Sequence, residues 1–198
     1  GVVPGNRTVV FTNNDDAYRT ALALQGAGAH VVVVDLRRDL KGELVKAVRA
    51  AGIEVMSGSA VTIAAGAQRI ARVEISPVNE GATQVLDDPI HMDCDLLAMS
   101  GGLTPAVHLH SQARGKLGWD DQQLCFKPTT VHEASFNAGA GSGVFAADKA
   151  IENGMQAGTA AARAAGFDIA DSSAPEVAAP AQSWRPLAAW KVTNGMGE

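Results

Sequence analysis

A turn whose residue types could hold a dinucleotide lies near the start of the chain, between an apolar strand and a helical segment. The usual glycine fingerprint gives a tight turn, lets the backbone approach a pyrophosphate, and lets the helix pack closely on the strand. Here its three glycine positions fall on Thr12, Asn14 and Ala17. Asn13 and Asn14 adopt positive φ more readily than most residues, so the turn itself is retained. Their side chains, however, occupy the space where a pyrophosphate would contact the backbone.

An acid is present where a second strand is expected to end. Asp35 follows Thr12 at about the spacing, roughly 20 residues, of the carboxylate that binds a ribose 2′-hydroxyl. Its neighbours Arg37 and Arg38 are alternative contacts for a 2′-phosphate. Asp15 and Asp16 place negative charge at a helix start, where it repels a phosphate. An Asp after a buried strand also commonly caps a turn, so nucleotide binding and a purely structural role both stay open. We expect any NAD binding to be weak or absent.

Strands and helices alternate through the first 56 residues. The expected elements are strands 8–12, 30–34 and 53–56 and helices 15–28 and 39–51. The strands are continuous apolar runs, which implies burial on both faces and hence a parallel sheet. Right-handed helical crossovers then join the strands. We predict an α/β fold: a Rossmann-like parallel sheet with helices on both faces, with strand 8–12 central and a last strand at 95–99.

The pattern changes after residue 60. Segments 61–65, 69–76 and 83–86 resemble strands with no helix between them, which predicts a small antiparallel meander. Further on, we expect a short helix at 105–112, a strand at 144–146 and a helix at 151–165. Residues 169–198 are rich in Ala, Pro and Ser and read as a linker.

Composition and charge exclude several classes of protein. The 198 residues are 46% hydrophobic and 19% charged, with a net charge of −5. The chain has no basic stripe of the kind that binds nucleic acid, and no apolar run long enough to cross a membrane. No signal segment is present at its start, so we expect a cytoplasmic protein. Two cysteines without a CxxC pair form no disulfide scaffold. His108 and His110 point to different faces, and we expect them at the surface. We assign no catalytic residue and no metal ligand.

Four segments carry a resemblance to a known family. They are residues 1–5 with 8–18 (GVVPG, TVVFTNNDDAY), 34–37 (VDLR), 95–105 (DLLAMSGGLTP) and 144–148 (VFAAD). Together they resemble the α subunits of heterotetrameric sarcosine oxidases, whose wider relatives include opine oxidase subunits and pyridine-nucleotide-disulfide-reductase-like proteins. Segment 144–148 departs from the family pattern because Ala147 replaces a glycine, so we carry no cofactor role onto Asp148.

The resemblance implies a domain organisation and a set of cofactor-binding residues. In such proteins an inserted NAD-type domain interrupts a first dinucleotide-binding domain. The implied domains are residues 1–104, the inserted Rossmann-like domain; 105–168, the return segment of the first domain; and 169–198, the linker. The implied cofactor-binding residues are Thr12, Asn13, Asn14, Asp35, Arg37, Gly101 and Gly102.

The resemblance also implies an activity for the intact enzyme. Such enzymes oxidise sarcosine to glycine and peroxide and pass the one-carbon unit to tetrahydrofolate, with FAD and FMN as flavins and NAD in the α subunit. The partners would be the other subunits and a small-molecule substrate. This chain would be a middle excerpt, inactive by itself. The alternative is a degenerate Rossmann scaffold of a related amine or opine oxidase that binds no nucleotide and serves in assembly.

Overall fold

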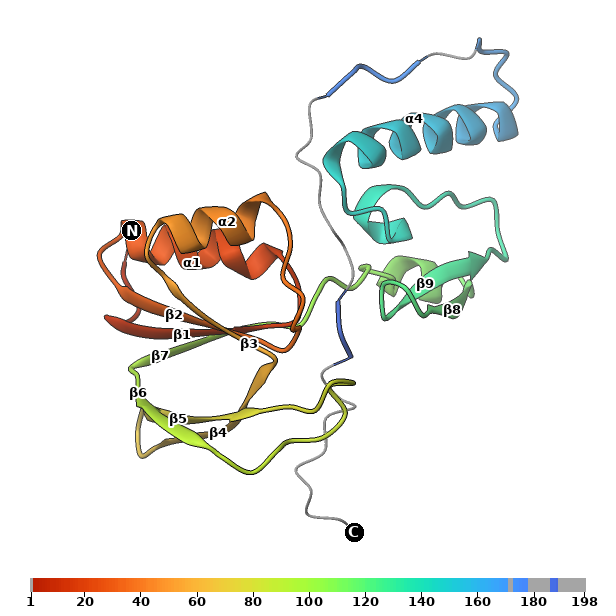
Figure 1. Cartoon of the computed structure of the whole chain (residues 1–198). Helices are drawn as coiled ribbons and strands as arrows, with labels where there is room; N and C mark the ends of the chain where they lie inside the picture. Colours follow the sequence, from red (N-terminus) through yellow and green to blue (C-terminus); the bar gives the residue numbers. More distant parts are fainter. Residues whose placement is uncertain (1, 171–172, 178–185, 189–198) are drawn as a thin grey trace. The chain divides into compact units, whose positions relative to one another are not determined.

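The computed structural model describes residues 2–170, 173–177 and 186–188 (Figure 1). Within these residues the chain forms two compact units. Unit 1 comprises residues 2–102 with 186–188, and unit 2 comprises residues 103–170 with 173–177.

A four-stranded parallel sheet forms the centre of unit 1. Its strands lie in the order β3, β2, β1, β7, with bounds β3 Glu54–Ser57, β2 His30–Asp35, β1 Arg7–Thr12 and β7 Leu96–Ser100. The prediction of a parallel sheet with β1 inside it is confirmed. Thr12 is in register with Asp35 on one side and with Ser100 on the other. The carboxyl ends of three neighbouring strands therefore meet at one edge.

Both helices of unit 1 cover the same face of this sheet. These helices are α1 (Asp16–Gly26) and α2 (Glu43–Ala50), and Tyr18 and Val48 are among the residues they bury against Val10 and Val33. The expectation of helices on both faces is therefore wrong for unit 1 (Figure 1). The chain steps from β1 to β2 to β3 in one direction, and right-handed crossovers in one direction lie on one face.

The other face of the sheet is covered by an antiparallel meander. The strands β4 (Ser59–Gly66), β5 (Ile70–Pro77) and β6 (Ile90–Asp93) pair in that order. From this meander, Val73 and Ile75 pack against the sheet. The meander is confirmed, but its third strand is 90–93 and not 83–86.

The segment predicted as that third strand instead follows a tight turn at 79–82 and runs back beside the end of β5. The Asn79 N–H donates to the Gln84 carbonyl oxygen at 2.9 Å, and the Leu86 N–H donates to the Pro77 carbonyl oxygen at 2.8 Å. The Asn79 side chain accepts hydrogen bonds from the backbone N–H groups of Thr83 and Gln84, at 2.8 and 3.2 Å. Beyond it, Val85 makes only an isolated bridge to Val78. The Asn79 side chain therefore holds the turn that precedes this short pairing.

Unit 2 is built from shorter elements. They are α3 (His108–Gln112), β8 (Lys116–Asp120), β9 (Cys125–Thr130), the 3₁₀ turn η1 (Gly139–Ser142) and α4 (Ala147–Ala164). The strand expected at 144–146 is not observed, because the chain there is the extended lead into α4, with Ala146 as its N-cap. None of the described residues of α4 is buried. None of the described helices is both long and apolar enough to cross a membrane.

His110 is a core residue of unit 2, which corrects the expectation of a surface position. It is 5% exposed, and its Nε2 and Nδ1 lie 3.0 Å from the Lys116 carbonyl oxygen and from the Asn137 Nδ2, respectively. A Cβ at Gly115 would lie 2.3 Å from the His110 ring. The missing side chain of Gly115 is therefore what lets the imidazole pack here.

The Thr8 hydroxyl on β1 provides a stability prediction. Thr8 is 2% exposed, and its Oγ1 has no hydrogen-bond partner among the described residues. A buried hydroxyl without a partner carries a desolvation cost. We expect Thr8→Val to raise the free energy of unfolding by about 1 kcal/mol, measured by urea denaturation.

The matched control is Thr62→Val in the meander. The Thr62 Oγ1 donates a hydrogen bond to the Glu74 carboxylate at 2.9 Å, so the same change there removes a bond and yields no gain. A Thr8→Val protein no more stable than the original would show that the hydroxyl is satisfied.

Candidate functional site

The Asp35 carboxylate lies at the carboxyl end of β2, fully buried. Its Oδ2 accepts hydrogen bonds from the Tyr18 hydroxyl and the Arg37 Nη2, both at 2.8 Å. Its Oδ1 accepts from the backbone N–H and the Nε of Arg37, at 2.9 and 3.1 Å. A carboxylate offers about four lone-pair sites. The acid expected to bind a ribose is thus saturated by the protein itself.

The Arg37 guanidinium links the Asp35 carboxylate to Asp15 at the start of α1. Its Nη1 lies 2.8 Å from the Asp15 Oδ1, and both side chains are 14% exposed. Burial lowers the pKa of the Arg37 guanidinium, but hydrogen bonds and charges from Asp35 and Asp15 outweigh it, so the pKa is raised. The Arg37 donors therefore point inward to two carboxylates, and Asp15 is neutralised by an ion pair.

The environment of Tyr18 leads to a spectroscopic prediction. Burial, and then the adjacent Asp35 carboxylate, raise the pKa of the Tyr18 phenol, since both disfavour a phenolate. Tyr18 is the only tyrosine of the chain. At about pH 10–11, where an ordinary tyrosine ionises, we expect folded protein to show little phenolate absorbance and urea-unfolded protein to show nearly all of it.

The same shift makes stability depend on alkaline pH. The folded pKa lies above the unfolded one, so the contribution of Tyr18 is complete below about pH 10 and is lost as the pH rises further. Asp35→Ala removes the neighbouring charge and serves as the comparison, with phenolate appearing at lower pH. Full ionisation of the native tyrosine near pH 10 would contradict a buried Tyr18–Asp35 bond.

Thr12, Asn13 and Asn14 form the turn after β1, and all three are buried. The Asn14 Nδ2 donates hydrogen bonds to the Ser100 carbonyl oxygen at 2.9 Å and to the Asn13 Oδ1 at 3.0 Å. The Asn14 Oδ1 accepts from the backbone N–H of Asp16 at 3.0 Å. This turn therefore joins β1 to β7 and caps the start of α1.

Gly101 and Gly102 follow β7 at the same edge. Gly102 has φ of 105°, a conformation that favours glycine. Gly101 lines a cavity of about 60 Å³ together with Thr12 and Asn13. This cavity lies between β1 and β7, where the strand order of the sheet reverses and where Rossmann folds bind dinucleotides. It is far smaller than the roughly 300–1,000 Å³ of usual ligand sites.

The structure thus brings the predicted residues together at one edge, but in an arrangement that does not fit a bound dinucleotide. Asp35 has its acceptor sites filled, and Arg37 is turned away from any 2′-phosphate. Sequence reasoning missed Tyr18 and Ser100, the partners that fill this network. Tyr18 directly follows Ala17 on the buried side of α1. Its position in the helical pattern could therefore have predicted a buried hydroxyl that faces β2.

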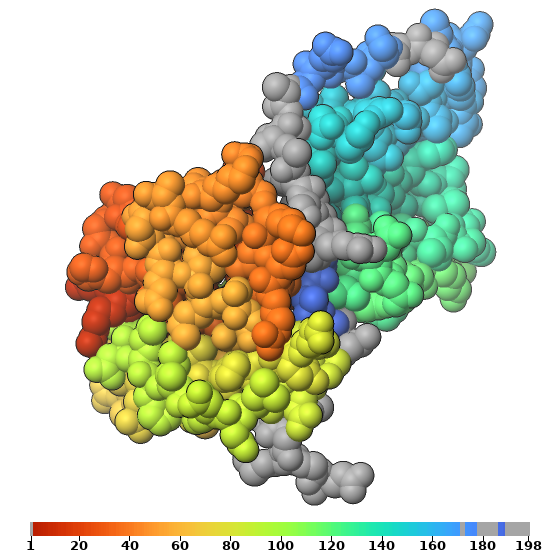
Figure 2. All heavy atoms as spheres, in the orientation of Figure 1, coloured from red at the N-terminus to blue at the C-terminus, as the bar shows by residue number. Residues whose placement is uncertain are grey.

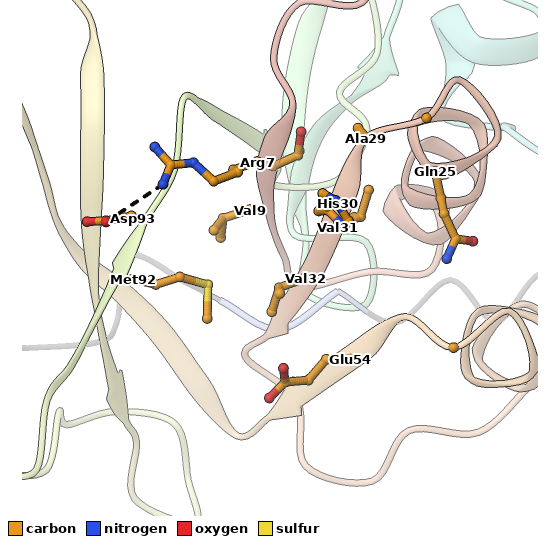
Figure 3. A pocket seen from close by; sticks show the side chains of 13 residues that line it. Arg7, Val9, Gln25, Ala29, His30, Val31, Val32, Glu54, Met92 and Asp93 are labelled. Atoms are coloured by element: carbon orange, nitrogen blue, oxygen red, sulfur yellow. Dashed lines mark ion pairs between the residues drawn. The ribbon is translucent and has the colours of Figure 1, made fainter.

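A larger cavity lies at the opposite, amino edge of the sheet in unit 1. It measures about 570 Å³, and Arg7, His30, Glu54 and Asp93 are the charged or titratable side chains among its lining residues (Figure 3). Arg7 and Asp93 form an exposed ion pair at 3.7 Å. None of the predicted cofactor-binding residues lines this cavity. Over the described residues, no group of three His, Cys, Asp or Glu side chains could hold a metal.

The comparison with solved structures defines the class of fold. Thioredoxin reductase of T. acidophilum matches with a TM-score of 0.56 and 14% identity, over 81% of this chain and 53% of that one. A ferredoxin reductase for the CYP199A2 system from Rhodopseudomonas palustris matches with a TM-score of 0.51 and 21% identity, over 80% of this chain and 41% of that one. The fold is therefore the Rossmann type found in these reductases, as predicted.

The curated relatives are more specific, although no family model matches the chain. Sarcosine oxidase subunit alpha of Corynebacterium sp. strain P-1 is 36% identical over 200 residues, and that of strain U-96 is 34% identical over 200 residues. Each alignment covers all of this chain and 20% of the relative. The chain is homologous to one segment of sarcosine oxidase subunit alpha and spans about a fifth of its length. The resemblance found in the sequence is confirmed.

Proposed function

We propose that this chain is the Rossmann-type domain of an α subunit in a multisubunit oxidoreductase that demethylates sarcosine. The proposed reaction converts sarcosine to glycine and peroxide, with the one-carbon unit passed to tetrahydrofolate. FAD and FMN would act elsewhere in a cytoplasmic heterotetramer with the other subunits as partners. Homology over the full length of the chain supports this proposal.

Within that enzyme, we propose that unit 1 is a scaffold which holds NAD weakly or not at all. The observation that carries this proposal is the saturated Asp35 carboxylate, both of whose oxygens are bound by Tyr18 and Arg37. A ribose hydroxyl would have to displace one of these buried donors. Displacement leaves a buried polar group unpaired, at a cost of about 1–3 kcal/mol.

The domain organisation belongs to the same proposal. Residues 1–104 would be the inserted domain and 105–168 the return segment of a first dinucleotide-binding domain. The exposure of α4 supports this, because no residue of this 18-residue helix is buried among the described residues, whereas an amphipathic helix ordinarily buries one stripe against another layer. Most of the proposed linker, 169–198, lies outside the described residues.

Calorimetric titration with NAD tests the scaffold proposal. We expect no saturable binding below about millimolar NAD, a standard free energy weaker than about −4 kcal/mol. Asp39→Ala is the matched control, because Asp39 lies in an exposed ion pair with Lys41, and the titration of this variant is expected to be the same. Micromolar affinity in the unmodified chain would overturn the scaffold proposal.

The activity proposal has its own test. Supplied with sarcosine, flavins, NAD and tetrahydrofolate, the purified chain is expected to form no peroxide, since it spans only a fifth of its relatives. Peroxide formation by the chain alone would place the reaction in this segment and contradict the proposed division of labour.

A further inference from the structure

A short segment from the far end of the chain lies on the edge that carries the candidate site. We call residues 186–188 the strap. The backbone N–H of Leu187 donates a hydrogen bond to the Asn13 carbonyl oxygen at 3.2 Å, and the Leu187 carbonyl accepts one from the Asn13 Nδ2. Both polar groups of the Leu187 backbone are thus satisfied by one residue of the turn after β1.

The strap is also anchored by apolar contacts. Leu187 packs against a buried cluster, Leu36, Ala60, Val78 and Ala82, with Phe11 beside it. Pro186 lies 3.7 Å from the position that a Cβ at Gly102 would occupy. The strap therefore runs along the carboxyl edge of the sheet, from the turn after β7, past β1, to the residue after β2. Figure 2 shows the strap in dark blue against the surface of unit 1.

This path coincides with the crevice that Rossmann folds use for ligands. In such sheets a dinucleotide crosses the carboxyl edge at the point where strand order reverses, which here lies between β1 and β7. We propose that the strap is an intramolecular occupant of this crevice, so that strap docking on Asn13 and dinucleotide binding exclude each other. The inference rests on the proposed function, in which unit 1 holds no nucleotide at rest.

This arrangement gives Asn13 a physical role. A side-chain amide offers both a donor and an acceptor. In Asn13 the Nδ2 donates to the strap, while the Oδ1 accepts from the Asn14 Nδ2 at 3.0 Å. An apolar side chain at this position would offer no donor to the strap. Asn13, which lies between the fingerprint positions Thr12 and Asn14, is therefore the residue of the turn that recognises the peptide.

The expected size of the competition follows from population arithmetic. A ligand that binds only the open state loses affinity in proportion to the open fraction. A strap docked for about 90% of the time lowers apparent affinity about tenfold, and one docked for about 99% of the time lowers it about a hundredfold. Releasing the strap is thus expected to improve NAD affinity by at least tenfold.

The test uses the full chain with Leu187→Asp, which places a carboxylate in the apolar cluster. Leu187→Met keeps the apolar contact, and Val177→Asp makes the same change at an exposed, described position. Amide hydrogen exchange at residue 187 reports docking, and calorimetry with NAD reports binding. We expect Leu187→Asp to speed exchange and improve NAD affinity at least tenfold, while the two controls change neither.

The possible outcomes separate this proposal from the scaffold proposal. If Leu187→Asp frees the amide but NAD affinity stays unchanged, the strap proposal fails and the saturated Asp35 alone accounts for the closed groove. Fast amide exchange at residue 187 in the unmodified chain would also contradict the strap proposal. So would fast exchange in the Leu187→Met variant when the Leu187→Asp variant stays protected. If the strap stays docked in the Leu187→Asp variant, the double variant Asn13→Ala/Leu187→Asp removes both the hydrogen bond of the Asn13 side chain and the apolar contact of Leu187. The same outcomes then decide the strap proposal in the double variant. Micromolar NAD binding by the unmodified chain defeats both proposals.

Discussion

Asp35→Ala is expected to lower the free energy of unfolding of unit 1 by about 3–5 kcal/mol, the usual cost of removing one partner from a buried ion pair. The change leaves the Tyr18 hydroxyl without its acceptor and leaves Arg37 paired only with Asp15. Tyr18 is fully buried and the Arg37 side chain is only 14% exposed, so water cannot readily replace the carboxylate. Urea denaturation followed by tryptophan fluorescence or circular dichroism measures the loss.

Two further variants separate the buried network from charge in general. Asp39→Ala removes an acid whose ion pair with Lys41 is about three-quarters exposed, and it is expected to change stability by less than about 1 kcal/mol. Adding Tyr18→Phe and Arg37→Met to Asp35→Ala removes all three polar partners and is expected to recover part of the loss. A loss below about 1 kcal/mol for Asp35→Ala would mean that solvent reaches this carboxylate.

Asn14→Gly is expected to lower the free energy of unfolding by about 2–3 kcal/mol, although glycine is the residue usual at this turn position. The change deletes the side-chain bonds to the Ser100 carbonyl and to the backbone N–H of Asp16. It also leaves the turn more freedom in the unfolded chain. The measurement is again urea denaturation, with NAD calorimetry alongside.

Ser100→Ala is the matched comparison for Asn14→Gly. It removes only the hydroxyl that lies 3.1 Å from the Asn14 Nδ2 and keeps the carbonyl acceptor, so a loss of about 1 kcal/mol or less is expected. Should Asn14→Gly prove neutral in stability and bind NAD more tightly, the asparagine would be an obstacle to a nucleotide and not a structural link.

Local patterns in the sequence were sufficient for the main elements of unit 1. The apolar run at 31–34 predicted a strand buried on both faces, and the structure places it as β2, beside the inner strand β1. The alternation across 69–76 predicted a half-exposed antiparallel strand, observed as β5. These patterns succeed because burial on one face or two depends on the spacing of neighbouring side chains along the chain.

Other features depended on particular contacts, some of them between residues only four or five positions apart. Residues 83–86 follow the turn held by the Asn79 side chain and make only a short bridge to the end of β5, and His110 is buried because Gly115 leaves room for its ring. The missing second helical layer followed from the direction in which successive crossovers step along the sheet. None of these effects has a periodic signature in the sequence.

The sequence by itself determined the fold class, the order of the parallel strands and helices of unit 1, and the set of residues that meet at the carboxyl edge, because parallel strands bring their ends together. Only the tertiary structure decided what those residues do there. Whether Asp35 faces a ligand or the interior depends on Tyr18, one helix away, and on the side-chain direction of Arg37. Whether the turn at Asn13 is open depends on Leu187, which reaches it from the other end of the chain. Hydrogen-bond partners are chosen by geometry in three dimensions, and residue types along the chain do not specify that geometry.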